Sequence, residues 1–228
     1  MDYLPYIVAA VVGYLLGSVP CGYLVAKSHG VDIFKVGSGN PGSTNVKRVL
    51  GSKAGNTVFA FDILKGVLAT GWIKLYWLVC AGHLFHAEEF TPLKSPTMLW
   101  MGLAGVVAAV IGHCFSVFTK FKGGKGVATA AGGLVVLMPY ACLTGAALWM
   151  VAFYSTRYVS LASILAAIAV PAASWILGNP LPLNIVATVI GLFVIIRHRA
   201  NIGRLLSGTE NRFVKKANPP GDKEKPGA

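Results

Sequence analysis

Residues 127–154 read VATAAGGLVVLMPYACLTGAALWMVAFY and contain no charged side chain, so this run decides how many helices the chain can place in a membrane. A helix that crosses a bilayer needs about 20 apolar residues at ~1.5 Å each. The run is longer than that, and Pro139 lies near its middle, where it removes a helical hydrogen bond. The run therefore predicts either one kinked helix or two short helices that meet at Met138-Pro139-Tyr140.

The composition of the whole chain suits lipid rather than water. Of its 228 residues, 55% are hydrophobic and 12% are charged, and the mean hydropathy is +0.65. Soluble domains carry about 25% charged residues, so this chain has too few polar groups to cover a soluble surface. The four cysteines form no CxxC pair and lie in or beside apolar runs, which predicts small buried side chains rather than disulfides or a zinc site.

Six apolar runs are candidate spans: 3–26, 56–80, 98–118, 127–154, 158–178 and 182–196. Basic residues gather in cytoplasmic segments of membrane proteins. Here they crowd 27–53, 120–125 and the tail from Arg197 on, whereas 81–97 carries only Lys94. With 81–97 outside, a single crossing by 127–154 would leave the basic tail outside, and two crossings bring it inside.

The charge pattern thus predicts an all-α, polytopic membrane protein with seven transmembrane helices, its N-terminus outside and its C-terminus cytoplasmic. The net charge of +12 is explained by this topology and by anionic ligands, and no nucleic acid partner is expected. Residues 1–213 are predicted to form a single transmembrane domain. The polar, Pro/Gly-rich tail 214–228 is predicted to be disordered. Residues 127–138 make a helix of only about 18 Å, a length typical of binding sites inside membranes.

The first cytoplasmic segment, 37–48, reads GSGNPGSTNVKR. Its glycines allow backbone N–H groups to converge on one anion, and its hydroxyl and amide side chains add further donors. Arg48 adds a cation that can bind phosphate through two hydrogen bonds. An ordinary turn needs two or three such residues, so the density of donors favours an anion site over a plain loop.

The second segment, 112–129, reads GHCFSVFTKFKGGKGVAT, and its Lys-Gly-Gly-Lys-Gly sequence opens a helix. Backbone donors, the positive end of the helix dipole and two ammonium groups together suit a phosphate. The alternative is a basic loop that only sets topology, but topology does not require the glycines. Lys125 is followed by Gly126 rather than Ser or Thr, so the segment is not a P-loop and ATP hydrolysis is not implied.

The third segment, 197–210, reads RHRANIGRLLSGTE. If the preceding helix continues, His198 and Asn201 share one face at a spacing of three residues. Arginines alone would serve as a topological anchor, so this pair is the informative feature. Glu210 is predicted to be a structural partner of a basic loop.

Three other residues are candidates for function. Asp62 and Lys65 are ionisable residues three apart inside a predicted span, where function and a structural ion pair are equally good explanations. His113 begins the second segment and has no clear role from the sequence.

Several catalytic patterns are missing. The chain contains no HxxxxD motif at His113 or His198, no GxSxG nucleophile elbow and no helical cluster of aspartates for divalent metals. A two-carboxylate or two-metal mechanism is therefore disfavoured, and neither a metal site nor a cofactor is expected.

Taken together, the three segments resemble the cytoplasmic motifs of the acyl-phosphate-dependent glycerol-3-phosphate acyltransferases of bacterial membranes, over roughly residues 3–213. The resemblance implies transfer of a fatty acyl group from acyl phosphate to the 1-position hydroxyl of glycerol 3-phosphate. The products are lysophosphatidic acid and phosphate, in the first step of phospholipid synthesis. It also implies a multi-pass protein of the bacterial cytoplasmic (inner) membrane with its active site facing the cytoplasm. The expected partners are both substrates, the bilayer and a peripheral acyl-phosphate synthase that supplies the donor.

The resemblance also assigns roles to residues. The catalytic group is Ser38, Arg48, Lys125, His198 and Asn201. The acyl-phosphate or product phosphate is expected to lie against Gly39, Asn40, Gly42, Ser43, Thr44 and Asn45. Glycerol 3-phosphate is expected to lie against Arg48, Lys122, Gly123, Gly124, Lys125, Gly126, His198 and Asn201. Direct transfer without an acyl-enzyme, with substrate phosphate as proton acceptor, is the predicted mechanism; His198 as general base is a competing version. The rival function is a membrane carrier for organic phosphates.

Overall fold

The computed structural model describes residues 3–80 and 96–213, with the backbone alone for 72–80, and every regular element in these ranges is a helix. The first half contains α1 (Leu4–Ser18), α2 (Cys21–Ser28), α3 (Ser43–Leu50), α4 (Ser52–Cys80), α5 (Pro96–Cys114) and the short 3-10 helix η2 (Val117–Thr119). The second half contains α6 (Val127–Leu137), α7 (Pro139–Thr156), α8 (Val159–Ile176), α9 (Leu181–Arg197) and α10 (Arg199–Leu206). The predicted tail 214–228 and most of the predicted outer segment lie outside the described residues.

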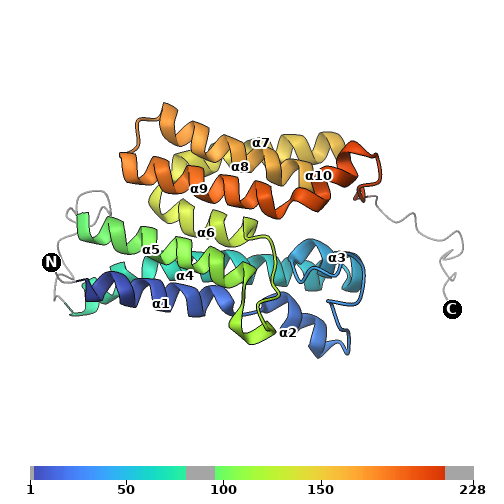
Figure 1. Ribbon diagram of the computed structural model, residues 1–228, viewed down its shortest axis with the longest axis horizontal. Helices are drawn as coiled ribbons and strands as arrows, with labels where there is room; N and C mark the ends of the chain where they lie inside the picture. Colours follow the sequence, from blue (N-terminus) through green and yellow to red (C-terminus); the bar gives the residue numbers. More distant parts are fainter. Residues whose placement is uncertain (1–2, 81–95, 214–228) are drawn as a thin grey trace, which may run out of the picture.

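The long helices run side by side in two layers (Figure 1). α1, α4 and α5 form one layer, α7 to α10 form the other, and the short α6 lies between them. α4 and α6 approach closely, because a Cβ at Gly66 would overlap the carbonyl of Thr129 and a Cβ at Gly132 would overlap that of Ile63. Small residues at such contacts let helix backbones pack together without a hydrophobic driving force.

Two helices occupy the run 127–154, as the sequence predicts for a turn at its proline. α6 ends at Leu137, Met138 has the non-helical angles φ −141° and ψ 67°, and α7 begins at Pro139. Proline is well suited to the first position of a helix, where its missing N–H would have no partner. α6 has 11 residues and is shorter than a bilayer crossing.

Three helical stretches of the described residues are long and apolar enough to cross a membrane: Leu4–Ser28, Pro96–Thr119 and Val159–Ile176. A fourth is obtained if α9 and α10 are taken together, although they are bent by 58°. The fold is therefore an all-helical membrane architecture.

Two of the apolar helices break near the predicted cytoplasmic segments of the sequence. The run 3–26 divides at Val19-Pro20 into α1 and α2, because proline cannot donate a helical hydrogen bond. The last helix does not continue through His198, which was the condition for His198 and Asn201 to share one helix face. The ring Nδ1 of His198 lies 2.8 Å from the Val194 carbonyl, which also accepts the His198 backbone N–H at 3.1 Å, and α10 starts at the next residue. The break leaves His198 and Asn201 both buried.

Candidate functional site

The three predicted segments meet at one end of the bundle, where α3, the connection that leads into α6 and α10 lie near one another (Figure 1). A cleft of about 220 Å³ opens there. It is lined by Ser38, Asn40, Lys125, Arg197, Arg199, Ala200, Asn201 and Arg204. Residues from all three segments therefore face one space, and four of them carry a positive charge.

The first segment forms a tight loop that presents Ser38 to this cleft. Gly37 and Gly39 have φ values of +60° and +66°, a region that glycine adopts without strain. Buried Asn45 holds the loop closed, since its Oδ1 accepts the Ser38 N–H at 2.9 Å and its Nδ2 donates to the Val36 carbonyl at 3.1 Å. The Asn45 amide is thus engaged within the loop, whereas Ser38 is exposed.

The remaining polar residues of this loop lie around the start of α3. The Asn40 Oδ1 accepts the Gly42 N–H at 2.9 Å, and Gly42 precedes the first helical residue. Ser43 and Thr44 occupy the first turn of α3 and are partly exposed. This helix start offers backbone donors beside the cleft, although Ser38 and Asn40 are the members of the loop that line it.

The second segment places one ammonium group in the cleft. Lys125 donates a hydrogen bond to Asn201 Oδ1, which joins the second segment to the third. Gly126, at φ +87°, turns the chain into α6. Burial lowers the pKa of Lys125 to about 8, and the nearby Arg204, Arg48 and Arg197 also lower it, while Glu210 opposes them. Lys125 is thus a cation held near other cations, a setting that an anionic ligand would relieve.

Glu210 organises the third segment. Its Oε1 accepts from Asn201 Nδ2 at 2.8 Å and from Ser160 Oγ at 2.9 Å, and its Oε2 lies 2.7 Å from Arg204 Nε. Burial alone would raise the pKa of this carboxyl group, but the hydrogen bonds from Asn201, Arg204 and Ser160 hold the pKa below its usual value. Glu210 therefore fixes two cleft residues, Asn201 and Arg204.

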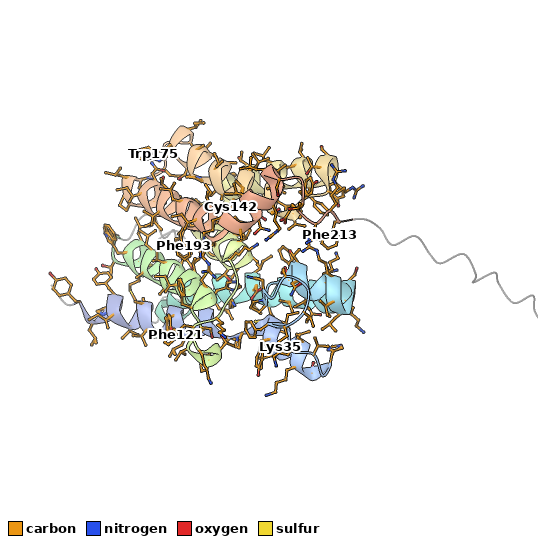
Figure 2. The ribbon with its side chains drawn as sticks, turned by 45° about the vertical axis from the view of Figure 1, so that its right-hand side comes forward. Lys35, Phe121, Cys142, Trp175, Phe193 and Phe213 are labelled. Atoms are coloured by element: carbon orange, nitrogen blue, oxygen red, sulfur yellow. The ribbon has the colours of Figure 1, made fainter. Side chains whose placement is uncertain are left out.

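Several predicted residues lie beside the cleft rather than in its lining. Arg48 donates from Nη2 to the Asn211 carbonyl at 3.2 Å, and its guanidinium lies 5.6 Å from the Phe213 ring. Figure 2 shows Phe213 where the segment after α10 passes beside α3. His198 is buried behind the cleft at the α9–α10 junction. Lys122, Gly123 and Gly124 line a second, smaller cavity.

Asp62, Lys65 and His113 also belong to that smaller cavity and not to the cleft. Asp62 and Lys65 form the ion pair that their spacing allows, with 2.8 Å between Oδ1 and Nζ. His113 Nδ1 lies 3.5 Å from the same carboxylate oxygen. The three side chains are buried together on the far side of the Gly123–Gly124 peptide.

The predicted site set omitted four residues that the structure adds. Arg197, Arg199 and Arg204 line the cleft, although in the sequence their charges were explained by topology. A high density of arginines around His198 and Asn201 was the signal that could have identified them. Ser160 contacts Glu210 from the first turn of α8, and nothing in its surrounding sequence marks it.

The cleft has the properties of a site for two anionic groups. Lys125 of the second segment and the three arginines of the third can bind phosphate oxygens, and the Ser38 hydroxyl of the first can donate a further hydrogen bond. Helix ends and exposed loop backbone add donors of the kind that stabilise negative charge during acyl transfer.

The chain matches the family model described as "Glycerol-3-phosphate acyltransferase" over residues 7–208. The glycerol-3-phosphate acyltransferase of Rubrobacter xylanophilus is 41% identical over 207 residues, which cover 91% of this chain and 94% of the relative. That of Aquifex aeolicus is 43% identical over 200 residues, which cover 88% of this chain and 95% of the relative.

Solved structures of PlsY, an integral membrane glycerol 3-phosphate acyltransferase, are also similar. The glycerol 3-phosphate form gives a TM-score of 0.76 at 41% identity, covering 92% of this chain and 96% of that one. The lysophosphatidic acid form gives a TM-score of 0.74 at 41% identity, covering 92% and 95%. Because the family model spans nearly all of the described helices, the chain belongs to the glycerol-3-phosphate acyltransferase family of integral membrane proteins.

Proposed function

We propose that this chain transfers a fatty acyl group from acyl phosphate to the 1-position hydroxyl of glycerol 3-phosphate. The observation that most strongly supports this proposal is one cleft lined by four cationic residues and by Ser38. The cationic residues are Lys125, Arg197, Arg199 and Arg204. Two phosphate-bearing substrates repel each other, and four cations around one space offset that repulsion. The PlsY structures in glycerol 3-phosphate and lysophosphatidic acid forms support this choice of acceptor and product.

The transfer is direct in this proposal. The acceptor oxygen attacks the acyl carbonyl carbon, the bond from that carbon to the phosphate oxygen breaks, and its electron pair leaves with phosphate. The hydroxyl proton passes to an oxygen of the departing phosphate, so lysophosphatidic acid and inorganic phosphate are the only products. Holding the hydroxyl against an already activated carbonyl makes the step effectively intramolecular, an effect worth up to about 7–11 kcal/mol.

The proposed roles follow the walls of the cleft. Lys125 and Asn201, with the neighbouring Arg204, hold glycerol 3-phosphate, while Ser38 and the loop backbone around it hold the phosphate of the donor. Arg48, which donates to the Asn211 carbonyl beside the cleft, completes the acceptor site. His198 orients the α9–α10 junction, and its Nδ1 contact with the Val194 carbonyl supports a ring that carries its proton on Nδ1.

The topology predicted from charge remains part of the proposal. We place seven transmembrane helices in residues 1–213, with the N-terminus outside and the C-terminus inside. The cleft then faces the cytoplasm of a bacterial inner membrane, where a peripheral acyl-phosphate synthase can deliver the donor. The cationic side chains of the cleft come from segments that this topology puts on one side, which supports it over a carrier with contacts on both sides.

The reaction is tested with purified protein in lipid nanodiscs, given palmitoyl phosphate and glycerol 3-phosphate with EDTA present. We expect phosphate release and lysophosphatidic acid formation at equal rates, and no product when palmitoyl-CoA replaces palmitoyl phosphate. Turnover with palmitoyl-CoA alone would overturn the donor assignment. Glycerol 3-phosphate uptake into sealed proteoliposomes without acylation would instead favour the carrier.

The pH dependence of the reaction is expected to report on Lys125. Its pKa near 8 means that the ammonium form is present below pH 8 and is lost as pH rises through that value. We therefore expect kcat/KM for glycerol 3-phosphate to fall about tenfold per unit above pH 8. Lys125→Arg keeps its charge at every accessible pH, so its profile should lose this limb. If kcat/KM of the Lys125→Arg variant still falls above pH 8, the titrating group is not Lys125.

A further inference from the structure

A second polar cavity lies behind the substrate cleft. It has a volume of about 20 Å³, room for a single water, and its walls come from the α1–α2 break, α4, the end of α5 and the loop before α6. The hydroxyl oxygen of Ser18 is fully buried on this wall and has no partner among the described residues. The cavity is large enough for one water, which could give this hydroxyl a partner.

The charged residues of this cavity are linked to one another and to three helices. Asp62 pairs with Lys65 at 2.8 Å, and Lys65 donates to the Val19 carbonyl at 3.1 Å, where the α1–α2 break exposes it. His113 Nδ1 lies 3.5 Å from the Asp62 carboxylate and 3.2 Å from the Thr129 hydroxyl on α6. Both contacts are made at Nδ1, so they hold this edge of the imidazole between α4 and α6.

The opposite edge of the imidazole supports the loop that carries Lys125. The His113 carbonyl accepts the Gly124 N–H at 3.1 Å. A Cβ at Gly124 would overlap the imidazole at Nε2, so the ring lies directly against this peptide. On the cleft side the Gly124 carbonyl accepts from Arg197 Nη2 at 2.9 Å. The Gly124 peptide is thus held between the buried cluster and an arginine of the cleft.

We propose that His113 is a positioning residue for the acyl transfer: Asp62, Lys65 and Thr129 orient its ring, and the ring sets Gly124 and hence the Lys125 ammonium. This inference rests on the proposed binding of glycerol 3-phosphate by Lys125. His113 itself touches neither substrate, because it lines the small cavity and not the cleft. Its loss should therefore impair binding of the acceptor phosphate and leave the donor site unchanged.

The test is a double-mutant cycle of His113→Ala and Gly124→Ala, with His29→Ala as the control because His29 is an exposed histidine at the end of α2. Each single variant should raise KM for glycerol 3-phosphate roughly 10–100-fold, the effect of a small displacement of a binding group. KM for palmitoyl phosphate should change less than about twofold, and this difference between the two substrates separates positioning from a general loss of stability.

The double variant provides the decisive comparison. Removing the imidazole makes room for the methyl group at position 124, so His113→Ala/Gly124→Ala should bind glycerol 3-phosphate better than the product of the two single losses. Additive losses, an unchanged KM in His113→Ala, or equal losses for both substrates would overturn the proposal. Calorimetric binding of glycerol 3-phosphate requires no turnover. It therefore separates failure of this inference from failure of the acyl-phosphate reaction.

Discussion

Replacing Lys125 by methionine should lower kcat/KM for glycerol 3-phosphate by roughly 100- to 1000-fold, within the range of about 2–5 kcal/mol for truncating one partner of a buried charge pair between protein and ligand. Among the described residues, Lys125 is the one lysine that lines the cleft. Its ammonium group donates to Asn201 and so joins the second segment to the third. Methionine keeps most of the side-chain volume, so the change is chiefly one of charge. Initial rates at subsaturating acceptor measure it directly.

The matched control is Lys53→Met, since Lys53 is exposed at the start of α4 and does not line the cleft. It should retain kcat/KM within about twofold, as expected for a surface charge. A Lys125→Met enzyme that is equally active would remove Lys125 from the site and leave the arginines to bind both phosphates.

Replacing Glu210 by alanine should damage both stability and catalysis. The side chain of Glu210 is 3% exposed, and its carboxylate accepts hydrogen bonds from Asn201, Ser160 and Arg204. Hydrogen bonds to a charged group contribute about 1.5–3 kcal/mol each, and the half-exposed Arg204 retains part of its solvation. We expect a thermal midpoint roughly 5–10 °C lower in detergent. We also expect kcat/KM to be about 100-fold lower, because Asn201 and Arg204 lose the hydrogen-bonding partner that holds their side chains toward the cleft.

Asp32→Ala is the control for this change. The side chain of Asp32 is 46% exposed and its salt bridge with Lys35 is 3.5 Å long, so little stability is at stake. The account predicts no measurable change in midpoint or rate for this variant. Full activity in a Glu210→Ala protein of lowered stability would show that Glu210 supports the fold without organising the cleft.

The sequence predicted those features of the fold that depend on hydropathy and charge. Pro139 in an apolar run indicated the break between α6 and α7, and the structure places that break at Met138. The bend at His198 could not be predicted in the same way. The His198 side chain contacts the Val194 carbonyl at this bend, and hydrophobic periodicity carries no information about such a contact.

The site was predictable by segment more than by residue. Glycines, hydroxyls and basic side chains marked all three segments, and Ser38, Asn40, Lys125 and Asn201 do share one cleft. Residue type alone did not reveal which of the polar side chains face the cleft. Asn45, for example, makes its hydrogen bonds within its own loop. The role of His113 required three-dimensional contacts, because Asp62 and Gly124 lie on opposite sides of it and far from each other in sequence.

The central claim is that one cleft holds both substrates while the acyl group passes directly between them. Initial rates measured over a grid of palmitoyl phosphate and glycerol 3-phosphate concentrations test it most directly. Direct transfer in a ternary complex predicts double-reciprocal lines that intersect. Parallel lines, the kinetic mark of an acyl-enzyme intermediate, would contradict the account and point to a nucleophile such as Ser38.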